Sequence, residues 1–308
     1  MSAVVAGTAS ERLAGAAAMI EYETLKAWRF APVVQDYDAR DCRLYALGLN
    51  LGADPLDADE LRYAADNSPT VVCTMPMALV RPGAWLRDPA VGIDYPRVVV
   101  GESALRLHAP LPPEARIEGR HRVVRVTDKG TGRGALVTVL REIYDTVTGR
   151  LLAEYEQVTF CRGDGGFAMD GRHDPAPEGP EWQAPARAPD AVISLRTAPQ
   201  QALIYRLSGD MNPLHSDPVV ARRAGFDRPI LHGLSTLGMV GHALDRAAQR
   251  AGGAGLSELR ARLSAPVFPG EVLVLRVWHE DAASLFRAVN GAEQEVVSRG
   301  IANFHKVD

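Results

Sequence analysis

Two long stretches of the chain alternate β-branched or aromatic residues with polar ones, as strands with one buried face do. The first stretch covers residues 116–161 and the second covers residues 271–304. Turn-forming sequences, such as Thr-Gly-Arg at 148–150 and Asn-Gly-Ala at 290–292, interrupt the alternation. We therefore expect strands that meander antiparallel, with one face of the sheet in water.

A helical period precedes the second stretch, in residues 233–253. Apolar residues recur there near one helical face: Leu234, Leu237, Val240, Leu244 and Ala248. Gly238 and Gly241 lower the intrinsic helix propensity, but they allow the helix backbone to pack closely against a sheet. The sequence thus predicts one long helix beside the second set of strands.

The two halves of the chain share a layout. Tyr45 and Leu47, in the sequence ARDCRLYALG, are echoed by Tyr205 and Leu207 in PQQALIYRLSGD. Some sixty residues after each of these sequences comes a proline-rich turn, HAPLPP in the first half and SAPVFPG in the second, and strand-like runs follow. We expect an α+β fold in which a long central helix wrapped by an antiparallel sheet occurs twice.

Composition suggests where the halves divide. Residues 163–189 are dense in Gly, Pro and charge and show no apolar period, which is typical of a linker. We predict a loose tail at 1–21, a first half at 22–163, a linker at 164–190 and a second half at 191–308. Each half then has an ordinary domain size.

Charge and cysteine content exclude several classes of protein. The net charge is −4 and Lys and Arg are dispersed, which argues against a nucleic-acid binder. The apolar run at 13–20 is too short for a membrane span, and no positive charge precedes it before Arg12 as a signal peptide would require. The three cysteines, Cys42, Cys73 and Cys161, have no metal or redox spacing. We expect a cytoplasmic protein with reduced thiols and no membrane or nucleic-acid partner.

The candidate chemistry lies in residues 208–233, SGDMNPLHSDPVVARRAGFDRPILHG. Asp210 and His215 are separated by Asn212 and Pro213, so a turn must bring the carboxylate and the imidazole together. Such a pair could share one water molecule and transfer its protons. The alternative is that Asp210 caps a short helix and His215 lies on the surface.

Gly233 comes directly before the central helix. Its amide N–H and those that follow would lie at the positive end of the helix dipole, where a carbonyl oxygen gaining charge is stabilised. An ordinary glycine at a helix start is the alternative reading. His232 and His242 lack a carboxylate or cysteine that would complete a metal set. We expect His232 to orient the loop and His242 to pack on the helix.

Taken in order, residues 205–233 resemble the signature of the R-specific enoyl-CoA hydratases, the hydratase 2 or MaoC-like dehydratase family. Every fixed element of Tyr-x-Leu-Ser-Gly-Asp-x-Asn-Pro-Leu-His and of Ala-Gly-Phe-x-x-Pro-Ile-x-His-Gly is present. In the first half GESALRLHAPLP, VTDKGTG and RGDGGF are similar to segments of two-domain members. The resemblance covers most of residues 22–308.

The resemblance implies a double hot-dog fold whose second half is catalytic. The first half, which lacks an Asp-x-Asn-Pro-x-His set, would be non-catalytic and would accommodate long acyl chains. Asp210 and His215 would hold and activate water, Asn212 would brace the loop, and the Gly233 amide would polarise the thioester carbonyl. Further substrate contacts implied are Gly101, Lys129, Met211, Pro213, Leu214 and Leu263. Val100 stands where family members have histidine, so a contact from that side chain is not expected here.

The implied reaction is reversible hydration of a trans-2-enoyl-CoA to a (3R)-3-hydroxyacyl-CoA, with no metal or organic cofactor. The partner is the acyl-CoA substrate, and a homodimer is compatible with the fold. Two other functions remain open on this scaffold: an acyl-CoA thioesterase and a non-catalytic acyl-thioester binding protein. A thioesterase usually carries a carboxylate on its central helix, and here none precedes Asp245.

Overall fold

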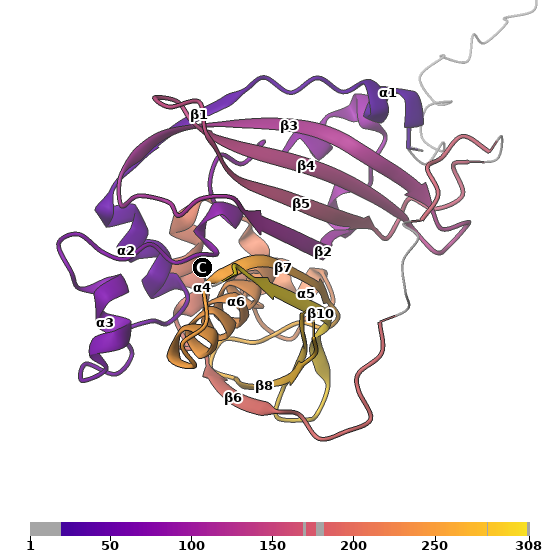
Figure 1. Ribbon diagram of the computed structural model, residues 1–308. Coiled ribbons are helices and arrows are strands. Elements are labelled where there is room, and N and C mark those ends of the chain that lie inside the picture. Colours follow the sequence, from indigo (N-terminus) through magenta and orange to yellow (C-terminus); the bar gives the residue numbers. More distant parts are fainter. Residues whose placement is uncertain (1–19, 169–170, 177–181, 282, 307–308) are drawn as a thin grey trace, which may run out of the picture.

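The computed structural model describes residues 20–168, 171–176, 182–281 and 283–306. Their strands form one sheet (Figure 1): β1 Val33–Tyr37, β2 Val98–Leu107, β3 Ala115–Asp128, β4 Ala135–Asp145, β5 Leu151–Cys161, β6 Ala191–Arg196, β7 Leu256–Leu263, β8 Val272–His279, β9 Ser284–Val289 and β10 Glu295–Phe304. The helices are α1 Tyr22–Ala27, α2 Ala39–Gly48, α3 Ala58–Ala64, α4 Gln201–Tyr205, α5 Pro218–Arg223 and α6 Gly233–Arg250. Short 3-10 turns complete the list: η1 Met75–Met77, η2 Trp85–Arg87, η3 Pro89–Val91, η4 Tyr95–Arg97, η5 Arg206–Ser208 and η6 Pro213–His215.

The strand order confirms the internal duplication. It runs β1-β3-β4-β5-β2 in the first half and, from the other edge, β6-β8-β9-β10-β7 in the second. These two orders are the same when β1 is matched with β6 and β2 with β7. The neighbouring strands pair antiparallel, as the alternating pattern predicts.

Strands β2 and β7 join the two halves into one continuous sheet. They pair antiparallel from Glu102 opposite Arg262 to Arg106 opposite Glu258. Within this pairing, Leu105 faces Leu259, and both side chains are buried. The seam therefore belongs to the hydrophobic core, and the halves share one fold rather than two separable ones.

Helix α6 fills the concave side of the second half of the sheet, where strands β6–β10 curve around it (Figure 1). A Cβ on Gly241 would lie 2.5 Å from Thr74 Cγ2 and 2.8 Å from Leu259 Cδ2, so this glycine permits close approach to β7, as expected. At Gly238 the near neighbours are instead Leu49 and Tyr45, around helix α2 of the first half. The expectation that both glycines pack against the sheet is therefore confirmed for Gly241 and wrong for Gly238.

The echoed tyrosines lie next to each other. Tyr45 of α2 and Tyr205 of α4 are both buried, with ring centroids 5.9 Å apart. Gly48 packs against Tyr205, and the Ser235 hydroxyl of α6 donates to the Gly48 carbonyl at 2.9 Å. The repeated sequence thus marks the place where the two halves meet on α6.

A long central helix in the first half was predicted and is wrong. The corresponding segment contains the four short turns η1 to η4 instead. Prolines recur through it at positions 69, 76, 82, 89 and 96. Each proline removes a backbone donor and clashes with the preceding helical turn, so no helix can continue through this segment.

The described residues between Cys161 and Ala191 form neither helix nor strand. The proposed linker at 164–190 falls in this segment, although its boundaries stay a prediction. Of the predicted tail, residues 1–19 lie outside the described residues. Within the described residues, no helix is both long and apolar enough to cross a membrane.

The packing at Gly241 generates a stability prediction. Gly241→Val should lower the free energy of unfolding by about 1–3 kcal/mol, because the added methyl groups overlap Thr74 and Leu259. Denaturant titration of the variant measures the change. Gly291→Ala is the matched control, since nothing lies within 4 Å of its added Cβ and stability should stay within about 0.5 kcal/mol. Equal stability of both variants and the parent would contradict the packing argument.

Candidate active site

The loop between α4 and α5 brings the signature residues together. Gly209 has φ +106°, a left-handed conformation that reverses the chain after η5. Asn212 then caps η6, its side-chain oxygen accepting the Leu214 amide at 3.1 Å. Asn212, and not Asp210, is therefore the capping residue. His215 ends η6 and is buried, so the alternative of a surface histidine does not hold.

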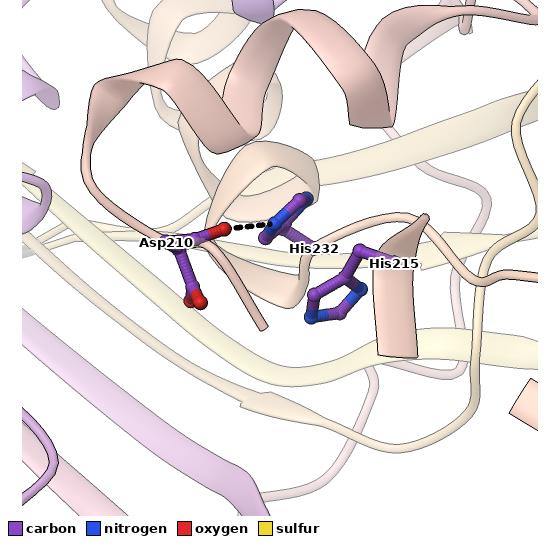
Figure 2. A group of neighbouring side chains, drawn as sticks. All are labelled: Asp210, His215 and His232. Carbon is purple, nitrogen blue, oxygen red and sulfur yellow. Dashed lines mark hydrogen bonds between the residues drawn. The ribbon is translucent and has the colours of Figure 1, made fainter. Parts of the chain in front are cut away.

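Asp210, His215 and His232 form one compact cluster (Figure 2). A carboxylate oxygen of Asp210 and one ring nitrogen of each histidine all lie within 4.8 Å of one another. At that separation, a single water molecule can contact the carboxylate and the His215 imidazole together. The turn thus brings the Asp210 carboxylate and the His215 imidazole together, as their spacing in the sequence required.

His232 supports the cluster from the start of α6. Its Nε2 lies 3.1 Å from the Asp210 carbonyl oxygen, the contact drawn in Figure 2. Its ring stacks on His215 with centroids 3.7 Å apart. The expectation that His232 orients the loop agrees with these two contacts. His242 packs elsewhere, edge-on to Tyr63 at 4.8 Å, as expected for a helix packing residue.

The hydrogen bonds assign a tautomer to each histidine. His215 Nδ1 donates to the Ile230 carbonyl at 2.9 Å, which leaves a lone pair on Nε2. His232 Nε2 donates to the Asp210 carbonyl, which leaves the lone pair on its buried Nδ1. In this arrangement His215 Nε2 is a proton acceptor in the site.

The environment holds the two histidines neutral and the aspartate charged. Burial lowers the pKa of His215, and burial together with the adjacent His215 lowers the pKa of His232 to about 3. Burial alone would raise the pKa of Asp210. The nearby Arg81 cation opposes burial most strongly, followed by the two imidazoles in their protonated form, and the net effect lowers the pKa of Asp210.

Gly233 opens α6 with a free amide. The Ser235 and Thr236 amides donate to the His232 carbonyl, whereas the Gly233 N–H makes no hydrogen bond with any of the described residues. A Cβ on Gly233 would overlap Leu263 Cδ1 of β7. A larger residue here would therefore displace the Leu263 side chain, and the amide of Gly233 is available to a carbonyl oxygen at the positive end of the helix.

These groups line a cavity of about 580 Å³ between the two halves. The second half contributes Asp210, His215 and Gly233 to its wall. The first half contributes side chains of β4 and β5 and of the turns that replace the missing helix, among them Trp85, Leu86, Val139, Tyr155, Gln157 and Phe160. The absent helix thus leaves room beside the first half of the sheet, in the place that α6 takes beside the second half.

The structure brings only some of the predicted substrate-binding residues to the cavity. Leu214 and Leu263 line it. Gly101 lies at a bulge in β2 beside Val100, which does line the cavity, and Lys129 Nζ lies 4.9 Å from the Phe160 ring centroid. Met211 and Pro213 are exposed, outside the wall. Substrate contacts of these last four residues stay predictions.

Sequence reasoning missed Arg81. Its Nη1 lies 3.0 Å from Asp210 Oδ2, although 129 residues separate the two in the chain. Arg141, which is buried, also lines the cavity and donates to main-chain carbonyls around η1. Neither arginine belongs to a recognisable motif, so no local signal could have identified it.

The cluster also has three potential metal-ligand atoms. The carboxylate is its one anionic group, and the Arg81 guanidinium already binds it at hydrogen-bond distance. A second cation at this carboxylate would be repelled by the first. The donor set therefore fits a water-binding pair better than a metal centre.

Comparison with known proteins agrees with the fold and with this site. The architecture is that of a double hot-dog protein, with one sheet built from two equivalent halves. Residues 35–163 match the MFE-2 hydratase 2 N-terminal domain and residues 181–300 match the MaoC like domain. The chain belongs to the MaoC-like dehydratase and hydratase 2 family.

The relatives cover nearly the whole chain. It is 39% identical to 3-hydroxyacyl-thioester dehydratase Y of Mycobacterium tuberculosis, over 86% of this chain and 92% of that protein. It is 33% identical to peroxisomal enoyl-CoA hydratase 2 of Arabidopsis thaliana, over 82% and 84% of the two chains. A solved MaoC-like dehydratase from Phytophthora capsici superposes with a TM-score of 0.80 at 27% identity, covering 93% of this chain and 98% of the other.

Burial of neutral histidines predicts how stability depends on pH. Burial lowers the pKa of His215 and His232, and it lowers the pKa of His121 and of His242 to about 4. The unfolded chain binds protons at these residues near pH 6.5, whereas the folded chain does not. The stabilisation that comes from keeping these histidines neutral is therefore fully present above that pH. It is lost as the pH falls toward the folded pKa values, by about 1.4 kcal/mol per pH unit for each histidine.

Denaturant unfolding between pH 7.5 and about 5 measures this slope. His242→Gln, which lies outside the catalytic cluster, should reduce the slope by roughly one proton. A free energy of unfolding that is flat over this range would contradict the burial of neutral imidazoles.

Proposed function

We propose that the protein is a hydro-lyase that reversibly hydrates trans-2-enoyl-CoA to (3R)-3-hydroxyacyl-CoA. The observation that carries the proposal is the placement of the Asp210–His215 pair and the free Gly233 amide on the wall of one cavity. Family membership supports it, since the relatives named above are a dehydratase of 3-hydroxyacyl thioesters and an enoyl-CoA hydratase.

The geometry supports a division of labour in the reaction. The Gly233 N–H donates to the thioester oxygen, which withdraws electrons from the conjugated double bond and makes the β-carbon electrophilic. A water molecule held by the Asp210 carboxylate passes a proton to His215 Nε2 as its oxygen bonds to the β-carbon. The electron pair of the double bond moves to the α-carbon and the thioester oxygen. His215 then returns the proton to the α-carbon from the same side.

The first half supports binding of the acyl chain. Its part of the cavity wall includes the apolar side chains Trp85, Leu86, Val139 and Phe160. An acyl chain that extends from a thioester at Gly233 into this space buries its methylene groups, each stabilised by about 0.8 kcal/mol. The space left by the missing helix thus serves substrate binding.

A thioesterase is less well supported by the same site. Asp245, the first carboxylate along α6, accepts the Leu256 amide at 2.7 Å and the Gln249 side chain at 2.8 Å. Both of its oxygens are thus engaged in holding the end of α6 against β7. Hydrolysis would need a carboxylate or nucleophile free to act at the thioester carbon.

The proposal includes no metal and no organic cofactor, because Asp210, His215 and the Gly233 amide supply each step. A chelator should therefore leave the rate unchanged. A cytoplasmic location is proposed from the free thiols of Cys42, Cys73 and Cys161, although the Arabidopsis relative is peroxisomal by name. A homodimer is proposed as the assembly, and light scattering in solution tests it.

The central test follows loss of the conjugated double bond in trans-2-enoyl-CoA substrates of several lengths. Asp210→Asn and His215→Ala should each lower kcat/KM by about 10²–10⁴-fold, because each removes a partner in the proton transfers. Chiral analysis should identify the 3R product.

Circular dichroism of both variants checks that they fold. Asp217→Asn serves as a matched control, because Asp217 only caps α5 in the neighbouring loop. Release of free CoA without hydration would assign a thioesterase. Absence of turnover with every substrate, or full activity of both variants, would overturn the proposal.

The cavity predicts a change in chain-length preference. Val139→Trp adds a large side chain to the first-half wall and should lower kcat/KM for dodecenoyl-CoA by about 10-fold or more, while crotonyl-CoA stays within about 2-fold. Steady-state kinetics with both substrates measures the ratio. The control is Val147→Trp at an exposed turn position, which should leave both values unchanged. An equal loss for the two substrates would place the acyl chain elsewhere.

A further inference from the structure

The Arg81–Asp210 ion pair connects the two halves at the reacting group. Arg81 Nη1 lies 3.0 Å from Asp210 Oδ2, and the Asn212 amide donates to Asp210 Oδ1 at 3.2 Å. Both carboxylate oxygens therefore have a donor, one from each half of the chain. The two side chains are largely buried, with exposed fractions of 31% and 23%, so solvent screens their interaction only in part.

The residue before Arg81 has an unusual backbone conformation. Val80 has φ +42°, a left-handed region that β-branched residues rarely adopt. Its amide donates to Gln35 Oε1 at 2.7 Å, and its carbonyl accepts from His121 Nε2 at 2.9 Å. The strained conformation is thus held from both sides by side chains of other elements. Such strain persists only where the surroundings impose it.

The sheet below is shaped to accept this turn. A Cβ on Gly119 of β3 would lie 2.7 Å from Val80 Cβ, so only glycine leaves room there. Arg141 Nη1 donates to the carbonyls of Pro76, Met77 and Leu79, and it has no carboxylate partner in the part of the chain described. The buried guanidinium gives up its hydration to make these three hydrogen bonds. Because they hold three carbonyls of the turn, the first half fixes the course of the chain from Pro76 to Arg81.

We propose that Arg81 is a positioning residue of the hydration reaction, presented by the clamped 76–81 turn so that the Asp210 carboxylate keeps its orientation and its negative charge. The inference rests on the proposed function, and it makes the first half a contributor to catalysis as well as to binding. Arg81 acts through Asp210, which holds the water.

The charges around Asp210 give the direction of the test. The titratable groups facing it are Arg81 from the first half, and His215, His232 and Tyr205 from the second. Both histidines are neutral near pH 7, so among these four groups Arg81 is the one that carries a positive charge. Without it, burial raises the pKa of Asp210, and the pKa of His215 rises because Arg81 no longer opposes its protonation. Both groups must be deprotonated in the reaction, so the acid limb of the kcat/KM profile should move to higher pH.

Arg81→Gln should lower kcat/KM by about 10-fold or more and move the acid limb upward by about one pH unit or more. Arg81→Lys keeps the cation and should restore most of the position of the acid limb. Arg116→Gln is the matched control, since Arg116 pairs with Asp36 at 3.2 Å on the exposed surface of the same half, and it should leave the profile unchanged. Unchanged rate and profile in Arg81→Gln would overturn the inference.

A remote variant tests the clamped turn itself. Gly119→Ala pushes on Val80 without touching the site, so it should lower kcat/KM and move the acid limb in the same direction as Arg81→Gln. Thermal unfolding of this variant checks that the fold remains. Loss of activity without movement of the acid limb would reduce the turn to a structural role.

Carbon-detected NMR titration of the Asp210 carboxyl separates this inference from the proposed function. The measurement needs no substrate, so it remains decisive even if no enoyl-CoA is hydrated. The midpoint should rise in Arg81→Gln relative to the parent protein and to Arg116→Gln. Equal midpoints in all three proteins would refute the role of Arg81, whatever the activity.

Discussion

The pairing of β2 with β7 is the constraint on which the rest of the structure depends. It joins two five-stranded halves into one sheet, with buried Leu105 and Leu259 facing each other at the seam. Because both strands belong to the core, the halves cannot shift without exposing apolar surface. The chain segments that precede these two strands are thereby held against each other. One of them carries Arg81, and the other carries the 209–215 loop and the start of α6.

The two halves have the same strand order, but different structures cover the concave face of each. In the second half, α6 fills it, and Gly241 lets the helix lie close to β7. In the first half, the prolines between residues 69 and 96 prevent a helix, and a cavity of about 580 Å³ takes its place. One half thus supplies the helix N-terminus that can stabilise a developing charge, and the other supplies the space that a long substrate needs.

Electrostatics at the site follow from burial and from one compensating cation. Burial keeps His215 neutral, so its Nε2 can accept a proton. The same burial would neutralise Asp210, and the Arg81 cation opposes that effect. A base and an anion can therefore stand side by side at neutral pH because the charge comes from the other half of the chain.

Local patterns determined the strands, the helix α6 and the reactive loop, because alternation, helical period and turn residues are properties of neighbouring positions. The order of residues from Tyr205 to Gly233 also identified the family, and the structure then brought Asp210 and His215 together. The expectation of a long helix in the first half was wrong, because it relied on the similarity of the two halves and not on the prolines between residues 69 and 96, which prevent a helix. Only the tertiary structure decided the Arg81–Asp210 pair, the stacking of His232 on His215 and the shape of the cavity. These depend on contacts between distant segments, Arg81 lying 129 residues from Asp210, and such contacts exist only once the sheet has closed at β2 and β7.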